Sequence, residues 1–326
     1  MSSNFQEFPA QSPSWSGEYT ADVSDPVPSN PNRKEWALSA LLFAATLICT
    51  TFAGFTYTIG LVGFPRLLKI IAAKPHFILS ALEFSLPLIL ILLAHELGHF
   101  FACRYYGIRC TPPYFLPVPL PFTGTFGAFI KIKSPFGNRR ELFDVGIAGP
   151  LAGFIVALAV IGIGIGFSHI TVIHPAQQHG IEFGKPLIFR LAAMLILNDN
   201  PAAHFMILHP TAIAGLWGLL VTSLNLLPAW QLDGGHIFYA VFGRKMQRAI
   251  TIVLLVLLVP FFYFVWSSLS YLVFCLMILI LGFRSRFFHP HTLRDWEQLG
   301  TGRKIMAIAA LLILFLSFTP IPIALL

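Results

Sequence analysis

The stretch that decides the fold runs from Phe84 to His99 and reads FSLPLILILLAHELGH. Its apolar part leads directly into the motif HELGH, and a membrane-spanning helix needs about 20 mostly apolar residues. On a helix, His95 and His99 lie four positions apart and project from one face, so both can bind one metal ion. Glu96 lies beside them, where it can take a proton from a water molecule. The sequence therefore predicts a metal site inside a membrane-spanning helix.

The composition is that of a membrane protein. Hydrophobic residues make up 56% of the 326 positions and charged residues 11%, against about 25% charged residues in soluble domains. The net charge of +7 comes from Lys and Arg in loops that flank apolar segments, which is typical of cytoplasmic loops. No basic patch with interleaved aromatic residues occurs elsewhere, so we expect the lipid bilayer as partner and no nucleic acid.

The apolar segments predict an all-α polytopic membrane protein with about seven transmembrane helices. The segment 250–283 is too long for one span and is divided into a hairpin near Trp266. With the N-terminus in the cytoplasm, sixteen of the 21 Lys and Arg residues fall in inside loops, which favours seven crossings and an outside C-terminus. The segments are 36–58, 77–105, 142–167, 211–230, 250–283 and 305–326.

Two regions flank or interrupt these helices. Residues 1–35 lack the basic and then apolar order of a signal peptide, so we expect a disordered cytoplasmic tail before one integral membrane domain, 36–326, with its core at about 77–236. Residues 111–127 are apolar but contain five prolines, which excludes a helix. Irregular backbone at membrane depth must be buried or line a cavity, so these residues predict a re-entrant loop beside the metal site.

Residues 126–133 alternate in polarity and predict a short β-strand. The edge of a strand can bind an extended peptide through backbone hydrogen bonds. We expect Gly124, Phe126 and Gly127 to lie against such a peptide. An ordinary surface hairpin is the alternative interpretation.

Asp233 is the expected third metal ligand. It follows the apolar segment 211–230 within NLLPAWQLDGGH, residues 225–236, where an acidic side chain is costly and usually marks function. The predicted topology puts Asp233 on the same side of the membrane as His95 and His99. Three protein ligands that leave a fourth position for water are typical of catalytic zinc, and we expect one Zn²⁺ per chain.

In the order of its motifs the sequence resembles the site-2 protease family of intramembrane zinc metalloproteases. The resemblance rests on HELGH, on GIAGPLAG at 146–153 and on the motif that begins at Asn225. It implies an intramembrane zinc endopeptidase in which His95, His99 and Asp233 bind zinc and Glu96 is the general base. It also implies that Asn225 holds the substrate or its oxyanion.

The resemblance further implies the setting of the reaction. The substrate would be the transmembrane segment of a single-span membrane protein, with an upstream site-1-type protease as a partner. The loop 168–210 is too short for a PDZ domain, so the chain looks like a compact member without PDZ or CBS domains, similar to the bacterial and chloroplast branch. We expect it in the bacterial cytoplasmic membrane, with the active site toward the cytoplasm.

Two other interpretations remain open. Buried His and Asp side chains in a basic polytopic protein can also conduct zinc or protons, as in a transporter. A transporter has no need of Glu96, however, and the chain shows no inverted repeat. An inactive scaffold of the same fold is the third interpretation, although all four expected catalytic side chains are present.

Overall fold

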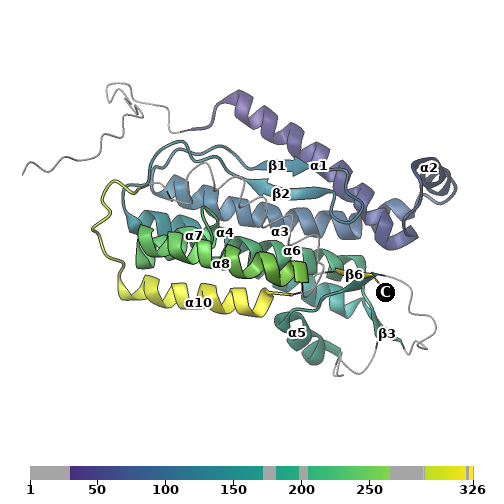
Figure 1. Ribbon diagram of the computed structural model, residues 1–326. Coiled ribbons are helices and arrows are strands. Elements are labelled where there is room, and N and C mark those ends of the chain that lie inside the picture. Colours follow the sequence, from purple (N-terminus) through teal and green to yellow (C-terminus); the bar gives the residue numbers. More distant parts are fainter. Residues whose placement is uncertain are drawn as a thin grey trace, which may run out of the picture.

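A computed structural model describes residues 30–171, 181–197, 205–264, 289, 291–320 and 323–325. In this part the chain is mostly helical. Its long helices lie side by side, with short strands beside and at one end of the bundle (Figure 1). The expectations for residues 1–29 of the tail and for the hairpin near Trp266 fall outside the described residues.

The helices follow the expected apolar segments closely in the first half of the chain. They are α1 (Arg33–Ile59), α2 (Phe64–Ala73), α3 (Phe77–Tyr105), α4 (Arg139–Gly166), α5 (Leu187–Leu197), α6 (Pro210–Leu226), α7 (Asp233–Phe242), α8 (Arg244–Phe264) and α10 (Thr301–Ser317).

The strands form three antiparallel pairs, β1 with β2, β3 with β5 and β4 with β6. They are β1 (Tyr114–Pro117), β2 (Thr125–Phe129), β3 (His169–Thr171), β4 (Ile181–Phe183), β5 (Phe205–Ile207) and β6 (Ile323–Leu325).

Three described helices, α1, α3 and α4, are long and apolar enough to cross a membrane, with 27, 29 and 28 residues. At a rise of 1.5 Å per residue, a helix of this length extends about 40 Å and exceeds the hydrocarbon core of a bilayer. These helices confirm three of the expected spans. Helix α6, with 17 residues, is shorter than an ordinary span.

The core lies between α3, α4, α6 and α7, with α1 and the β1–β2 hairpin on one side and α10 on the other (Figure 1). Small residues let the central helices approach closely. A Cβ on Gly98 of α3 would lie 2.4 Å from the carbonyl oxygen of Ala148 in α4, so only glycine fits there. The same holds between α4 and α6, where a Cβ on Gly164 would lie 2.3 Å from the nitrogen of Ala212.

The expected C-terminal end of the helix 211–230 is wrong. Helix α6 stops at Leu226, because Pro228 disfavours helical backbone at the residue before it and cannot donate a helical hydrogen bond. A short turn connects α6 to the separate helix α7, of which Asp233 is the first residue.

The expected C-terminal end of the helix 305–326 is also wrong. Helix α10 stops at Ser317, and Ile323–Leu325 form β6. Pro320 explains the stop, since it has no N–H for a helical bond. Strand β6 pairs with β4, which lies in the expected loop 168–210 together with β3, α5 and β5. Such short elements depend on distant pairing, which periodicity does not reveal.

The proline-rich segment 111–127 is non-helical, as expected, and most of it belongs to the β1–β2 hairpin. Strand β2 covers 125–129 rather than 126–133, and β1 is its partner. The Ser39 hydroxyl of α1 donates a hydrogen bond to the carbonyl of Pro113 at 2.6 Å. Trp217 of α6 donates through Nε1 to the hydroxyl of Tyr57 at 3.0 Å, and that hydroxyl donates to the carbonyl of Phe122. The hairpin is thereby fixed against α1 and α6.

Candidate metal centre

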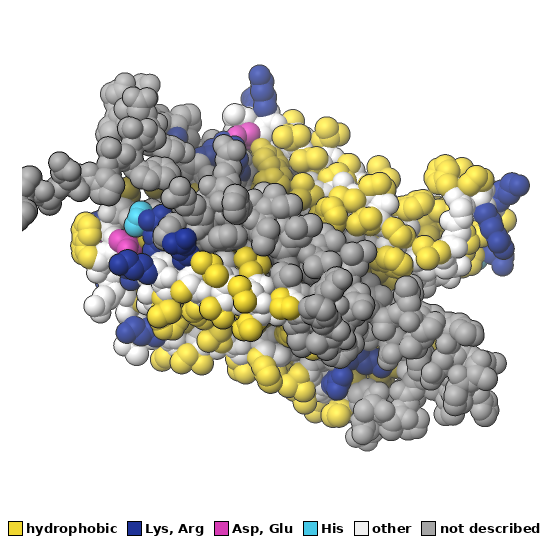
Figure 2. Space-filling view, viewed as in Figure 1, with side chains coloured by type: hydrophobic (Ala, Val, Ile, Leu, Met, Phe, Trp, Pro, Cys, Tyr) yellow, Lys and Arg dark blue, Asp and Glu magenta, His cyan; other side chains and the backbone are white. Residues whose placement is uncertain are grey.

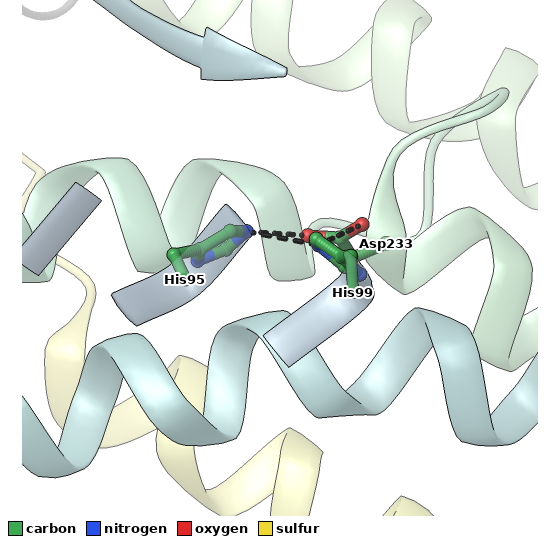
Figure 3. Close-up of side chains that lie close together, drawn as sticks. All are labelled: His95, His99 and Asp233. Carbon is green, nitrogen blue, oxygen red and sulfur yellow. Dashed lines mark hydrogen bonds and ion pairs between the residues drawn. The ribbon is translucent and has the colours of Figure 1, made fainter. Parts of the chain in front are cut away.

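Helix α3 positions His95 and His99 one turn apart, with 3% and 7% of their surface exposed. Asp233 reaches them from the first position of α7. Within the described residues, ligand atoms of these three side chains all lie within 4.8 Å of one another, and Figure 3 shows the three side chains pointing toward one another. The structure therefore brings together the three residues that the sequence suggested as a set.

The spacing of the donor atoms suits a tetrahedral metal. His95 Nε2 lies 3.1 Å from Asp233 Oδ2, and His99 Nε2 lies 3.3 Å from Asp233 Oδ1. The two Nε2 atoms are 3.2 Å apart. Ligands about 2.0 to 2.1 Å from a tetrahedral zinc ion lie about 3.3 Å from each other, and nitrogen and carboxylate oxygen are among the ligands that zinc prefers. The donor set thus fits zinc.

A hydrogen bond fixes the ring of His99. Its Nδ1 lies 2.7 Å from the carbonyl oxygen of Val145 in α4 and donates to it. The proton on Nδ1 leaves Nε2 with a free lone pair, and Nε2 is the atom that faces Asp233 and His95. Sequence reasoning missed this role of Val145, because a backbone carbonyl carries no residue-specific signal.

Glu96 is also buried, with 5% of its surface exposed. It interacts electrostatically with His95, His99 and Asp233, and the backbone of Ile130 lies close to its carboxylate. Ile130 directly follows strand β2. The hairpin therefore approaches the glutamate of the motif at Ile130.

Asn225, in the last turn of α6, lies at the same centre. Its Nδ2 is 3.3 Å from Nε2 of His95. The side-chain amide can donate to an acceptor near the metal ligands, so its position is compatible with holding a substrate oxygen.

The other expected substrate-binding residues lie in the hairpin. Gly124 has φ +70° and packs on α1, since a Cβ there would lie 2.3 Å from the carbonyl oxygen of Cys49. Gly127 has φ +100° and is buried. The Phe126 side chain between them is 68% exposed. These three residues shape the hairpin. No described contact joins them directly to the metal centre, which the hairpin approaches at Ile130.

The glycines of α4 make room for the two histidine rings. A Cβ on Gly149 would lie 2.1 Å from Nε2 of His99, and one on Gly153 would lie 3.1 Å from Nδ1 of His95. Gly146 faces α7, where a Cβ would lie 2.9 Å from that of His236. The motif GIAGPLAG thus serves the close packing of α4 against α3 and α7.

A strained turn presents Asp233. Trp230, with φ 45°, adopts the left-handed conformation that favours glycine. Its N–H donates to Thr251 Oγ1 at 2.8 Å, and its carbonyl accepts from Gln247 Nε2 at 2.8 Å. Gln247 and Thr251 are fully buried on α8. Sequence reasoning missed them, although two polar residues four apart on one face of an apolar helix are a signal that could have found them.

The chain matches the family model described as Peptidase family M50 over residues 83–264. It is 28% identical over 244 residues to "Probable zinc metalloprotease EGY1, chloroplastic" of Oryza sativa subsp. japonica, covering 68% of this chain and 40% of the relative. It is 34% identical over 168 residues to "Probable zinc metalloprotease EGY2, chloroplastic" of Arabidopsis thaliana, covering 50% of this chain and 29% of the relative. The matches thus span less than half the length of these relatives.

Proposed function

Because this chain belongs to peptidase family M50, the site-2 protease family, we propose that it is an intramembrane zinc endopeptidase that cleaves transmembrane segments of membrane proteins. The observation that carries the proposal is the buried convergence of His95, His99 and Asp233 beside Glu96, on a helix of 29 mostly apolar residues. The chain is an integral membrane protein, and we propose that a substrate helix reaches this centre from within the bilayer.

His95, His99 and Asp233 would hold one zinc ion, which when bound acts as a Lewis acid that polarises a peptide carbonyl and lowers the pKa of water to about 7. Glu96 takes the proton from the attacking water at a carboxylate oxygen and returns it to the leaving nitrogen of the peptide. The backbone of Ile130 lies beside that carboxylate and would help to orient it. Asn225 donates from Nδ2 to the substrate oxygen on which negative charge develops.

The substrate must be extended before it is cut, because a helix buries its carbonyls in hydrogen bonds. We propose that β2 takes the extended stretch as an added strand, with Gly124, Phe126 and Gly127 along it. Two observations support this assignment. In the described residues β2 pairs only with β1, and Ile130, directly after β2, lies close to Glu96.

We further propose seven crossings with the N-terminus and the metal centre toward the cytoplasm of a bacterial membrane. Ion pairs that join the expected inside loop between 283 and 305 to the start of α4 support this topology. Arg139 pairs with Asp295 at 3.1 Å, and Arg303 pairs with Asp144 at 2.6 Å. The substrate class proposed is a single-span membrane protein, which an upstream site-1-type protease trims first.

The test compares the native protein with Glu96→Gln, which keeps the shape and the three metal ligands but cannot accept a proton. Proteomics of cells that carry either form identifies membrane proteins whose cleaved fragments disappear in the variant. With such a substrate and both purified proteins, we expect the variant to retain zinc and to lose cleavage by about 10² to 10⁴ fold. Cleavage at the native rate would contradict the mechanism. Zinc flux that is lost in the variant, with no proteolysis by either protein, would favour a transporter.

A further inference from the structure

A basic amphipathic helix lies apart from the metal centre. Helix α2 connects the end of α1 to the start of α3. Figure 1 shows α2 beyond the end of the bundle, turned away from the direction in which the long helices run. Gly60, with φ +85°, follows α1 and allows this change of direction, because a positive φ favours glycine. Helix α2 therefore stands outside the group of long helices.

The apolar residues of α2 face two directions. Leu67 is buried, with 3% of its surface exposed, and belongs to a cluster with Phe55 of α1 and Ala81 of α3. Phe64 and Leu68 are four positions apart, so they share one side of the helix, and they are 59% and 51% exposed. Leu67 thus attaches α2 to the bundle, while Phe64 and Leu68 leave an apolar strip on the outside.

The opposite side of α2 is basic. At about 3.6 residues per turn, Arg66 points away from the side that Phe64 and Leu68 share, and Lys69 lies three positions on, on the same face as Arg66. Lys74 follows directly as the residue that caps the helix. All three cations are exposed. Figure 2 shows Lys and Arg side chains beside hydrophobic ones at the end of the molecule where α2 lies in Figure 1.

Neighbouring carboxylates do not balance the three cations of α2. No acidic residue occurs between Glu35 and Glu83 in the sequence. Glu83 pairs with His209 at 3.4 Å, and no salt bridge within the described residues includes any of the three cations. Under the proposed topology they lie on the outside, where Lys and Arg are normally scarce. The usual composition of membrane-flanking loops therefore does not account for them.

We propose that α2 lies in the membrane–water interface and binds the headgroups of anionic phospholipids through Arg66, Lys69 and Lys74. A helix with one apolar and one basic face lies in the plane of the interface, with the apolar face about 5 to 10 Å deep. Basic side chains beside the membrane surface are attracted by the negative charge of anionic lipids. The proposal does not depend on proteolytic activity.

The position of α2 favours a lipid surface over a soluble acidic partner. Helices α1 and α3 are long and apolar enough to cross a membrane, and α2 joins their ends, so it lies at the level of a membrane surface. In water the exposed areas of Phe64 and Leu68 would be unfavourable in proportion to their size. In the interface they enter the acyl boundary, while the long basic side chains reach the phosphates.

Anchored in this way, α2 fixes the depth of the metal centre. Helix α3 starts at Phe77, shortly after α2, and His95 lies 18 residues further on. At 1.5 Å per residue this is about 27 Å along α3, and the hydrocarbon core of a bilayer is about 30 Å thick. The metal centre then lies near the opposite boundary of the core, at a depth that the headgroup contacts of α2 help to hold.

The test places the full chain in bilayer nanodiscs, in a background without the native cysteines. Leu68→Cys carries a fluorophore, and phosphatidylglycerol or phosphatidylcholine with a spin label high on one acyl chain quenches it. We expect both lipids to quench the probe, because it lies in the bilayer. Since each cation near an anionic surface is worth about a fivefold gain in affinity, phosphatidylglycerol should half-quench the probe at a membrane fraction severalfold lower than phosphatidylcholine.

Removal of the charges should abolish this lipid preference. The α2 variant combines Arg66→Gln, Lys69→Gln and Lys74→Gln. It leaves Leu67 in place, which attaches α2 to the bundle, so the probe should still be quenched, but equally by the two lipids. Should the cysteine-free protein fail to fold, native mass spectrometry of the chain with its own cysteines counts the bound phosphatidylglycerol. That number should fall in the α2 variant.

A matched control separates a lipid site from general surface charge. It removes three cations at exposed positions near the other end of the bundle (Figure 1). The control variant combines Arg33→Gln, Lys34→Gln and Lys304→Gln. Both the preference of the probe for phosphatidylglycerol and the number of bound lipids should stay as in the native protein, because these positions are remote from α2.

Three outcomes would overturn the proposal. The first is equal quenching by the two lipids in the native protein. The second is quenching by aqueous iodide without quenching by lipid, which would show that α2 faces water and presents its cations to an acidic segment of another protein. The third is a loss of the lipid preference, or of bound phosphatidylglycerol, that is the same in the α2 variant and in the control.

Discussion

The imidazole of His99 occupies the space that a side chain at Gly149 would fill. A Cβ on Gly149 would lie 2.1 Å from Nε2 of His99, far inside van der Waals contact. The ring crosses α4 at this position and reaches the carbonyl of Val145, one turn earlier, at 2.7 Å. The absence of a side chain on α4 is therefore a condition for the orientation of a metal ligand on α3.

Gly149→Ala should displace His99 and weaken zinc binding. Since loss of the partner that orients a metal ligand typically costs about 10- to 100-fold in metal affinity, we expect at least that effect here. Competition with a chromogenic chelator measures the affinity, and circular dichroism checks that the helices remain. Gly162→Ala on the same helix is the control, because its Cβ would lie 3.9 Å from the nearest atom, an ordinary contact. Equal zinc affinity in the two variants would contradict the packing argument.

Asp233→Ala should leave a site of two histidines and weaken zinc binding sharply. The carboxylate is the one charged ligand of the proposed set, and its oxygens face both imidazoles at 3.1 and 3.3 Å. Zinc content after dialysis, measured by atomic emission, gives the result. Glu83→Ala removes a carboxylate of the same helical bundle whose side chain is 46% exposed, and it should retain one zinc per chain. Full and tight zinc occupancy in Asp233→Ala would show that the ligand assignment is wrong.

The sequence could predict the residues of this metal centre better than the contacts that hold those residues in place. HELGH fixed the face of α3, because the spacing of i and i+4 is a local property of a helix. It could not predict that α6 ends at Leu226 and that Asp233 begins a separate helix, α7, since the turn between them depends on distant partners. Those partners, Gln247 and Thr251, are on α8 and contact Trp230 across 17 and 21 residues of sequence.

Thr251→Val should destabilise the turn that presents Asp233. The change keeps the volume but removes the acceptor of the Trp230 N–H, and an unsatisfied buried donor costs about 1 to 3 kcal/mol. We expect a lower thermal unfolding midpoint and weaker zinc binding together. Thr58→Val is the matched control, because the Thr58 hydroxyl bonds only carbonyls of its own helix, α1. If both variants behave alike, the bond between α8 and the turn has no special role.

The topology gives the last prediction, and labelling of single cysteines tests it in a background without the native cysteines. The carbonyl of Gln298 accepts a hydrogen bond from Nε of Arg140 at 3.4 Å, so Gln298 lies beside the first turn of α4. Cysteines at these two positions should therefore react from the same side of the membrane. With seven crossings that side is the cytoplasm, and Lys185→Cys, in the opposite loop, should react from outside. Reaction at position 298 from the outside only, with position 140 reacting from the cytoplasm, would overturn the hairpin crossings and with them the proposed count.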